Sequence, residues 1–126
     1  MIGQKNKINM ENKVVFLDID GCLVKHHGGH SSSLIQNKTV LLPGVKEKLD
    51  EWEVEGCQII ITTGRKESFR KFTEKQLLVC GIAYDQLVMG LGRGERIVVN
   101  DRKVDGSNSA RAFCIERNEG IGGIIL

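Results

Sequence analysis

The sequence predicts an α/β fold with an open, mostly parallel sheet in three layers, with helices flanking the strands. Short β-branched runs alternate along the chain with segments of helical period, as in such folds. The first apolar run, VVFL at 14–17, is continuous, which is typical of a strand covered on both faces. With 126 residues, the chain can form one core but not two. We therefore expect one domain at 13–126 after a flexible lead-in at 1–12, with the first strand central in the sheet.

Two helices are expected between the strands. The segment LLPGVKEKLDEWEVEG (41–56) has Pro43 where it suits a helix start and Gly56 at its end. The segment KESFRKFTEKQLLVCG (66–81) has a similar period and ends at Gly81. The residues expected to face the core are Val45, Leu49 and Trp52 in the first helix and Phe69, Phe72, Gln76 and Val79, widened by Leu77 and Leu78, in the second.

Four more segments are interpreted as strands. They are CQIIITT (57–63), DQLVM (85–89), RIVVN (96–100) and RAFCIE (111–116). Only six residues separate DQLVM from RIVVN, whereas a parallel crossover needs a dozen or more. Either DQLVM is not an orthodox parallel strand or the domain is trimmed there. The polar, glycine-rich stretch at 24–39 predicts a loop or a small hairpin.

Composition and charge argue against several classes of protein. A net charge of +2 with scattered basic residues does not favour nucleic acid as a partner. No apolar run is long enough to span a membrane, and the polar start MIGQKNKINMENK has no signal region, so a cytoplasmic protein is expected. The cysteines form no CxxC pair, and we expect free thiols that pack as small buried hydrophobes. They are Cys22, Cys57, Cys80 and Cys114.

Polar side chains gather where the predicted strands end. They are Asp18 and Asp20 after the first strand, Thr62 and Thr63 at the second, and Asn100, Asp101 and Asp105 after RIVVN. Because active sites in open parallel sheets lie at the carboxyl ends of the strands, these residues are expected to meet. Converging carboxylates raise each other's pKa unless a cation lies between them. Mg²⁺ prefers oxygen ligands and keeps positions for water and a substrate phosphate, so a magnesium site is predicted.

The motifs DIDGCL, ITTGR and VVNDRKVD resemble, in order and position, the first, second and fourth motifs of the haloacid dehalogenase superfamily of phosphatases. This resemblance covers about residues 13–105. The segments LLPGVKEKLDEW, ITTGRKES and VVNDRK are similar to those of small phosphatases found with polysaccharide biosynthesis genes. The stretch at 24–39 lies where larger relatives insert a cap domain, and it is too short for one. The resemblance therefore implies a Rossmann-like domain with a capless, open site.

The resemblance further implies a magnesium-dependent phosphomonoesterase that acts on a sugar phosphate or a related small metabolite. Asp18 would attack phosphorus to form an aspartyl-phosphate. Asp20 would protonate the leaving oxygen and then activate the water that hydrolyses the intermediate. Mg²⁺ would be bound by the Asp18 carboxylate, the Asp20 backbone carbonyl and Asp101, with Asp105 in support through the water shell of the metal.

The phosphoryl group also needs a hydroxyl and a cation as partners. The resemblance gives Thr62, with Thr63 beside it, as the hydroxyl partner. Arg96 at the entry to the RIVVN segment is the expected cation, and Arg93 and Lys66 compete with it for this role.

Some of these residues have a second interpretation. Arg65 in TTGR is either a structural cation paired with a carboxylate or a phosphate contact. A DxDG sequence also begins calcium loops, but the later ligands of that motif are missing. His26, His27 and His30 lack a Cys or acidic partner to complete a zinc site, which favours a solvated flap.

Two other functions compete with the leading one. An open site admits polymers, and TTGR resembles the corresponding turn of polynucleotide end phosphatases, although the missing basic stripe with aromatics counts against them. The non-enzymatic alternative is a scaffold that binds magnesium and phosphate without turnover, and the presence of Asp20 argues against it. Because an uncapped site cannot enclose a small substrate by itself, a homo-oligomer is expected.

Overall fold

The computed structural model describes residues 12–126, which form a parallel sheet of three strands with helices beside it. In spatial order the strands are β1 (Val14–Leu17), β2 (Gln58–Thr62) and β3 (Gln86–Val88). Leu17 lies opposite Ile61, and Thr62 lies opposite Val88, so the three strands end at one edge of the sheet. The predicted α/β class with an open parallel sheet is therefore confirmed.

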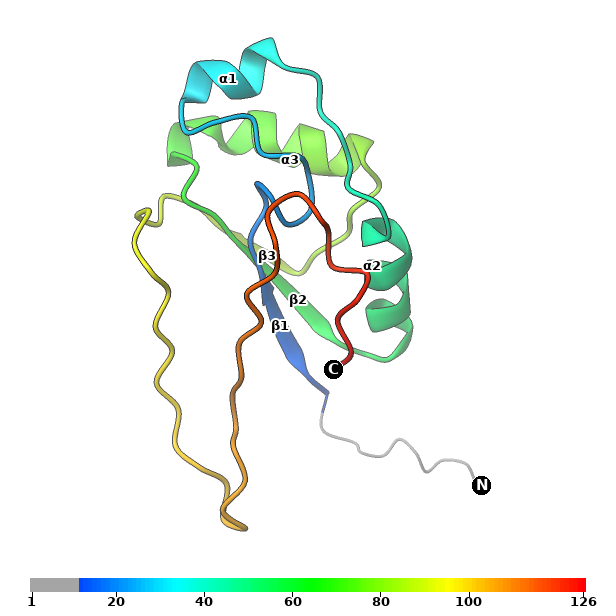
Figure 1. Ribbon diagram of the computed structural model, residues 1–126, viewed down its shortest axis with the longest axis vertical. Helices are drawn as coiled ribbons and strands as arrows, with labels where there is room; N and C mark the ends of the chain where they lie inside the picture. The colour runs from blue at the N-terminus through cyan, green and yellow to red at the C-terminus, as the bar shows by residue number, and fades with distance from the viewer. Residues whose placement is uncertain (1–11) are drawn as a thin grey trace.

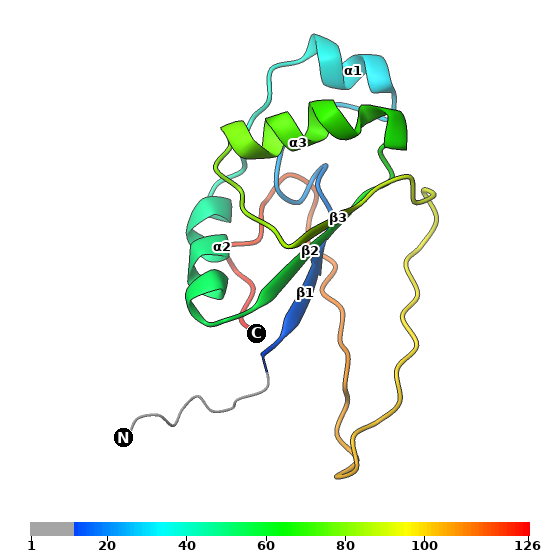
Figure 2. The ribbon, with the colours of Figure 1, turned by 180° about the vertical axis from the view of Figure 1, so that it is seen from behind.

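The two longer helices cover one face of this sheet. The helices are α1 (Ser31–Gln36), α2 (Val45–Val54), the short 3₁₀ helix η2 (Glu67–Phe69) and α3 (Arg70–Val79). Because the strand order advances in one direction, two right-handed crossovers place α2 and α3 on the same face. Both views show them on the side of the sheet away from a long loop (Figures 1 and 2). Gly56 and Gly81 follow the helices with φ values of 85° and 74°, as expected for residues that end a helix.

The apolar core lies between the sheet and these helices. Val45, Leu49 and Trp52 are buried as predicted, with only 1% of Trp52 exposed. They form one cluster with Leu17 of β1 and Ile61 of β2. The spacing of three and four residues on α2 thus correctly identified its buried face.

The predicted buried face of α3 is only partly correct, because Leu77 is buried and Phe69 packs against the core as expected, whereas Phe72 is exposed. Leu77 and Thr73 are buried there, whereas Leu78 and Val79 are largely exposed. The difference arises from a polar contact. Thr73 faces the core because its hydroxyl accepts a hydrogen bond from the buried side chain of Arg65. An inward polar contact therefore sets the rotation of this helix, which a count of apolar residues does not detect.

The sheet is smaller than the sequence predicts. The segments RIVVN (96–100) and RAFCIE (111–116) form no strand within residues 12–126, and 91–112 form a long exposed loop. As a result β1 is an edge strand rather than a central one, and 64% of Phe16 is exposed. The six residues between DQLVM and RIVVN are too few to return the chain to the start of a parallel neighbour, which accounts for the missing strand at RIVVN. The predicted three-layer arrangement is thus not formed by the described residues.

Three smaller expectations can be compared with the structure. The stretch at 24–39 contains the short helix α1, which was not predicted, and Val24 forms an isolated antiparallel bridge with Leu41. The cysteines are free as predicted, but Cys22, Cys57 and Cys80 are only partly buried and Cys114 is exposed. Among the described residues, no helix is both long and apolar enough to cross a membrane. The predicted lead-in at 1–12 lies almost wholly outside the described residues.

Candidate functional site

A tight turn places two carboxylates at the edge where the strands end. Asp18 directly follows β1, and Asp20 enters a turn in which the N–H of Leu23 donates to the carbonyl of Ile19 at 2.8 Å. Gly21 adopts a φ of 88° in this turn, a conformation that glycine reaches without strain. The sequence DIDG thus ends a strand and reverses the chain within a few residues.

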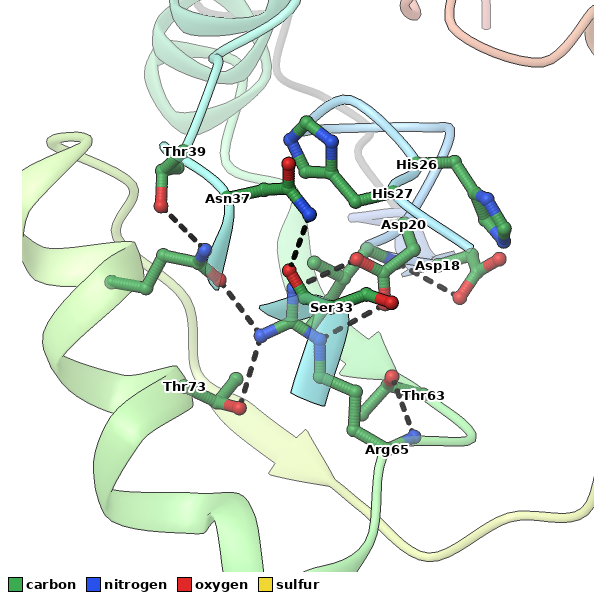
Figure 3. Close-up of polar contacts among 12 residues, drawn as sticks. Asp18, Asp20, His26, His27, Ser33, Asn37, Thr39, Thr63, Arg65 and Thr73 are labelled. Carbon is green, nitrogen blue, oxygen red and sulfur yellow. Dashed lines mark hydrogen bonds and ion pairs between the residues drawn. The ribbon is translucent and has the colours of Figure 1, made fainter. Parts of the chain in front are cut away.

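A buried arginine, Arg65, forms an ion pair with Asp20 (Figure 3). Arg65 donates from Nε to Oδ2 of Asp20 at 2.9 Å and from Nη2 to Oδ1 at 2.8 Å. The side chain of Arg65 is only 3% exposed, and that of Asp20 is 22% exposed. Nη1 of Arg65 donates to Oγ1 of Thr73 at 3.1 Å and to Oε1 of Gln76 at 2.7 Å. Of the two interpretations of Arg65, the structure thus shows the pairing with a carboxylate.

Asp18 has a different environment. Its Oδ1 accepts a hydrogen bond from the N–H of Ile19 at 2.9 Å, and the ion pairs within residues 12–126 do not include it. Although Asp18 reaches solvent, burial of its carboxyl is the largest cause that raises its pKa above the ordinary value. The charge of Asp20 also raises this pKa, while the Ile19 bond, Arg96 and His26 lower it. Asp18 is therefore a partly dehydrated carboxylate without a close counter-ion.

The two predicted threonines have different surroundings. Oγ1 of Thr62 donates to the carbonyl of Leu17 at 3.5 Å, immediately before Asp18. Thr63 is only 1% exposed, and its Oγ1 accepts from the N–H of Arg65 at 3.1 Å. Thr62 thus lies beside Asp18, whereas Thr63 supports the turn that carries Arg65.

The candidate cations differ in their distance from the carboxylates. Arg96 lies close enough for its charge to lower the pKa of Asp18, and its guanidinium donates to two carbonyls of its own loop at 2.7 Å each. Arg93 donates to a backbone carbonyl in the stretch at 24–39. Lys66 is exposed after the TTGR turn. Among these three, Arg96 is the one with an electrostatic effect on Asp18.

The structure does not bring Asp101 to the other predicted metal ligands. Figures 1 and 2 both show the orange tip of the loop 91–112 beyond the end of the sheet where β1 begins. Asp101 and Asp105 are exposed residues of this loop. Among residues 12–126, no three His, Cys, Asp or Glu side chains approach closely enough to hold a metal. The predicted donor set is therefore only partly present, as the Asp18 carboxylate and the adjacent Asp20 peptide.

The acidic turn contacts a segment near residue 118 that no sequence pattern predicts. The N–H of Asn118 donates to the carbonyl of Gly21 at 2.9 Å, and its Oδ1 accepts from the N–H of His26 at 2.8 Å. Asn118 has a φ of 69°, which asparagine tolerates better than most residues. No motif marks this residue, because its role depends on a segment about ninety residues away.

The polar partners of Arg65 were also missed. Thr73 and Gln76 lie three residues apart on α3 and therefore face the same way. Two polar residues at this spacing inside an otherwise apolar helix pattern were the available signal. Gln76 was interpreted as part of an apolar face instead, and Thr73 was assigned no role.

A cavity of about 200 Å³ lies at the opposite end of the sheet, where the strands begin. Leu49, Tyr84 and Asp85 are among its lining residues, and none of the predicted site residues is. The carboxylates at the strand ends therefore remain the candidate functional site.

Comparison with known proteins gives limited but specific likenesses. No protein-family model matches the chain, and no curated protein does. A chain of the Pnkp1/Rnl/Hen1 complex is similar at 26% identity with a TM-score of 0.54, over 71% of this chain and 31% of that one. A crystal structure of a protein from Vibrio cholerae is similar at 20% identity with a TM-score of 0.48, over 73% of this chain and 82% of that one. The chain thus spans less than a third of the first of these structures, with which it shares an α/β fold.

Proposed function

We propose that the protein is a phosphomonoester hydrolase in which Asp18 is the nucleophile and Asp20 is the acid and base. The proposal rests on the difference between the environments of these two carboxylates. Arg65 grips both oxygens of Asp20, whereas Asp18 is partly dehydrated and has no close counter-ion. Two carboxylates in different environments can take different roles. The resemblance of DIDGCL to the first motif of haloacid dehalogenase phosphatases assigns the nucleophile to Asp18 and the acid and base to Asp20.

The reaction would proceed in two steps at phosphorus. An oxygen of Asp18 attacks in line, so a bond from Asp18 to phosphorus forms while the bond to the leaving oxygen breaks, and Asp20 gives that oxygen a proton. Water then attacks the aspartyl-phosphate, Asp20 takes its proton, and phosphate leaves with the Asp18 carboxylate restored. Thr62 and Arg96 would bind the phosphoryl oxygens.

Magnesium belongs to this proposal. The ion would neutralise the charge of the phosphoryl group and of Asp18 when bound. For Asp101 to contribute a ligand, the loop 91–112 would have to fold back toward the end of β1. The motifs DIDGCL, ITTGR and VVNDRKVD, which resemble those of haloacid dehalogenase phosphatases, support this part of the proposal.

The proposed substrate is a sugar phosphate or a related small metabolite, and we include a homo-oligomer that would shield the open site. A polynucleotide end phosphatase is the second candidate. It is favoured by the likeness to a chain of the Pnkp1/Rnl/Hen1 complex. Its mark would be binding of single strands that weakens steeply with salt.

A phosphate-release screen tests the function and separates these candidates. The purified protein is incubated with and without Mg²⁺ on sugar phosphates, nucleotides, an aryl phosphate and 3′-phosphorylated oligonucleotides, with Asp18→Asn as the control. We expect magnesium-dependent release that the variant lacks. Release confined to oligonucleotides would support the second candidate. Binding of Mg²⁺ without release from any compound would identify a non-catalytic scaffold instead.

A further inference from the structure

We propose that a buried polar chain, from Arg65 through Gln76 to Thr39, orients Asp20, so that the segment after α1 positions the catalytic acid. The inference rests on the function proposed above, because it assigns positioning residues to that same site. Arg65 and Gln76 act through Asp20 and touch no reacting atom.

The first link is the two-pronged contact between Arg65 and Asp20. A carboxylate has about four lone-pair sites, and the bonds from Nε and Nη2 use one on each oxygen. One site on each oxygen is left to exchange a proton with the leaving group or with water. Since the guanidinium is planar and rigid, these remaining sites point in a fixed direction.

The second link is Gln76, whose amide has only one useful orientation. Arginine can only donate, so the Oε1 of Gln76 must face Nη1 of Arg65, which it meets at 2.7 Å. The amide NH₂ must then find an acceptor on the other side. It donates to Oγ1 of Thr39 at 2.7 Å.

The third link connects this chain to the surface. Thr39 belongs to the segment that joins α1 to α2 and is partly exposed. His27 is tied to the same segment, because its Nε2 lies 3.0 Å from the carbonyl of Lys38. Figure 3 shows Thr39, Arg65 and Asp20 in succession around the end of the sheet. A shift of this segment would therefore reach the acid through two side chains.

The test compares two substrates that differ in their need for an acid. An alkyl phosphate has a poor leaving group that must be protonated, whereas 2,4-dinitrophenyl phosphate releases its phenolate without a proton. The value of kcat/KM is measured for both, because it reports the first phosphoryl transfer. The variants are Arg65→Lys, which loses the fork, and Thr39→Val, which removes the last acceptor at a partly exposed position. Arg70→Lys, at an exposed ion pair at the start of α3, is the matched control.

We expect Arg65→Lys to lose about 100-fold on the alkyl phosphate, as for loss of a general acid, and less than about tenfold on the dinitrophenyl ester. Thr39→Val should lose about threefold on the alkyl phosphate alone, which is what one hydrogen bond is worth. Arg70→Lys should leave both values unchanged, and Asp20→Asn should reproduce the selective loss.

Equal losses on both substrates, in either variant, would overturn the inference and leave Arg65 and Thr39 with a purely structural role. If Thr39→Val changes neither value, the proposed roles of Gln76 and Thr39 in orienting Asp20 are overturned. A wild-type protein that hydrolyses neither ester would instead refute the proposed function, and this inference would fall with it. Melting curves of each variant distinguish a misplaced acid from an unfolded protein.

Discussion

At Asp18 the chain keeps a carboxylate that stability alone would not select. A pKa raised above the ordinary 3.8 means that the folded state binds the proton more tightly than the unfolded state. The stabilising contribution is therefore complete only below the ordinary pKa and is lost as pH rises through the raised value. At neutral pH the ionised group opposes folding.

The substitution Asp18→Asn should thus stabilise the protein while it abolishes phosphate release. The amide keeps an acceptor for the N–H of Ile19 and removes the dehydrated charge. We expect a higher melting temperature for the variant at about pH 7 and a smaller difference at about pH 4. Thermal melts at both pH values measure this, and a variant that melts below the wild type at neutral pH would show that the carboxylate is stabilising.

A second residue-scale prediction concerns Cys22, which lies in the acidic turn. Burial raises the pKa of its thiol to about 11, and the charge of Asp18 adds to the shift. Because the thiolate is the reactive form, an alkylating reagent at neutral pH should modify the exposed Cys114 well before Cys22. Peptide mass mapping after brief iodoacetamide treatment gives the order. Early labelling of Cys22 in the native protein would contradict the burial described here.

Residue identity predicted part of the site. Asp18, Asp20 and Thr62 were placed at the strand ends because polar residues directly follow apolar runs. The partner of Arg65 could not be predicted, since nothing in a sequence states which carboxylate a buried arginine meets 45 positions away. Asn118 was missed for the same reason.

At the scale of elements, the hydrophobic periodicity of the sequence predicted those strands and helices that depend mainly on local sequence. The runs at β2 and β3 became strands, and α2 buried the face that its spacing indicated. The run RIVVN has a β-propensity similar to that of β2 and β3 but forms no strand. A strand needs a neighbouring strand to pair with, and the short connection after β3 does not allow RIVVN to pair in parallel with one.

Helix α3 offers a matched pair of neighbours that tests its observed orientation. Leu77 is fully buried, whereas 77% of Leu78 is exposed. The change Leu77→Ala should lower the free energy of unfolding by about 2–5 kcal/mol. In contrast, Leu78→Ala should change it by less than about 0.5 kcal/mol. Urea titration of both variants measures the difference, and equal effects would mean that the helix is rotated toward the face first predicted.

At the scale of the whole molecule, the loop 91–112 makes few contacts with the rest of the described residues. Its apolar residues Ile97, Val98 and Val99 are exposed, and its hydrogen bonds are mostly within the loop itself. The proposed magnesium site requires this loop to change position, because Asp101 lies on it.

The movement can be followed by limited proteolysis. Without Mg²⁺, trypsin should cut first within the loop, at Arg102 and Arg111, which are exposed. With Mg²⁺, we expect slower cutting there, as Asp101 approaches Asp18 and the loop becomes ordered. The variant Asp101→Asn should lose this protection and also controls for any effect of the ion on the protease. Identical cleavage with and without Mg²⁺ would count against Asp101 as a ligand.

The contact at Asn118 also bears on how the protein is made. The turn that contains Gly21 leaves the ribosome early, and its partner follows only after some ninety more residues. Contacts so distant along the chain close late in folding. Ile121, which is completely buried, is synthesised only three residues after Asn118 and therefore also joins the core late. A nascent chain released by a premature stop before residue 118 would therefore lack both the hydrogen bonds of Asn118 to the acidic turn and to His26 and the buried side chain of Ile121.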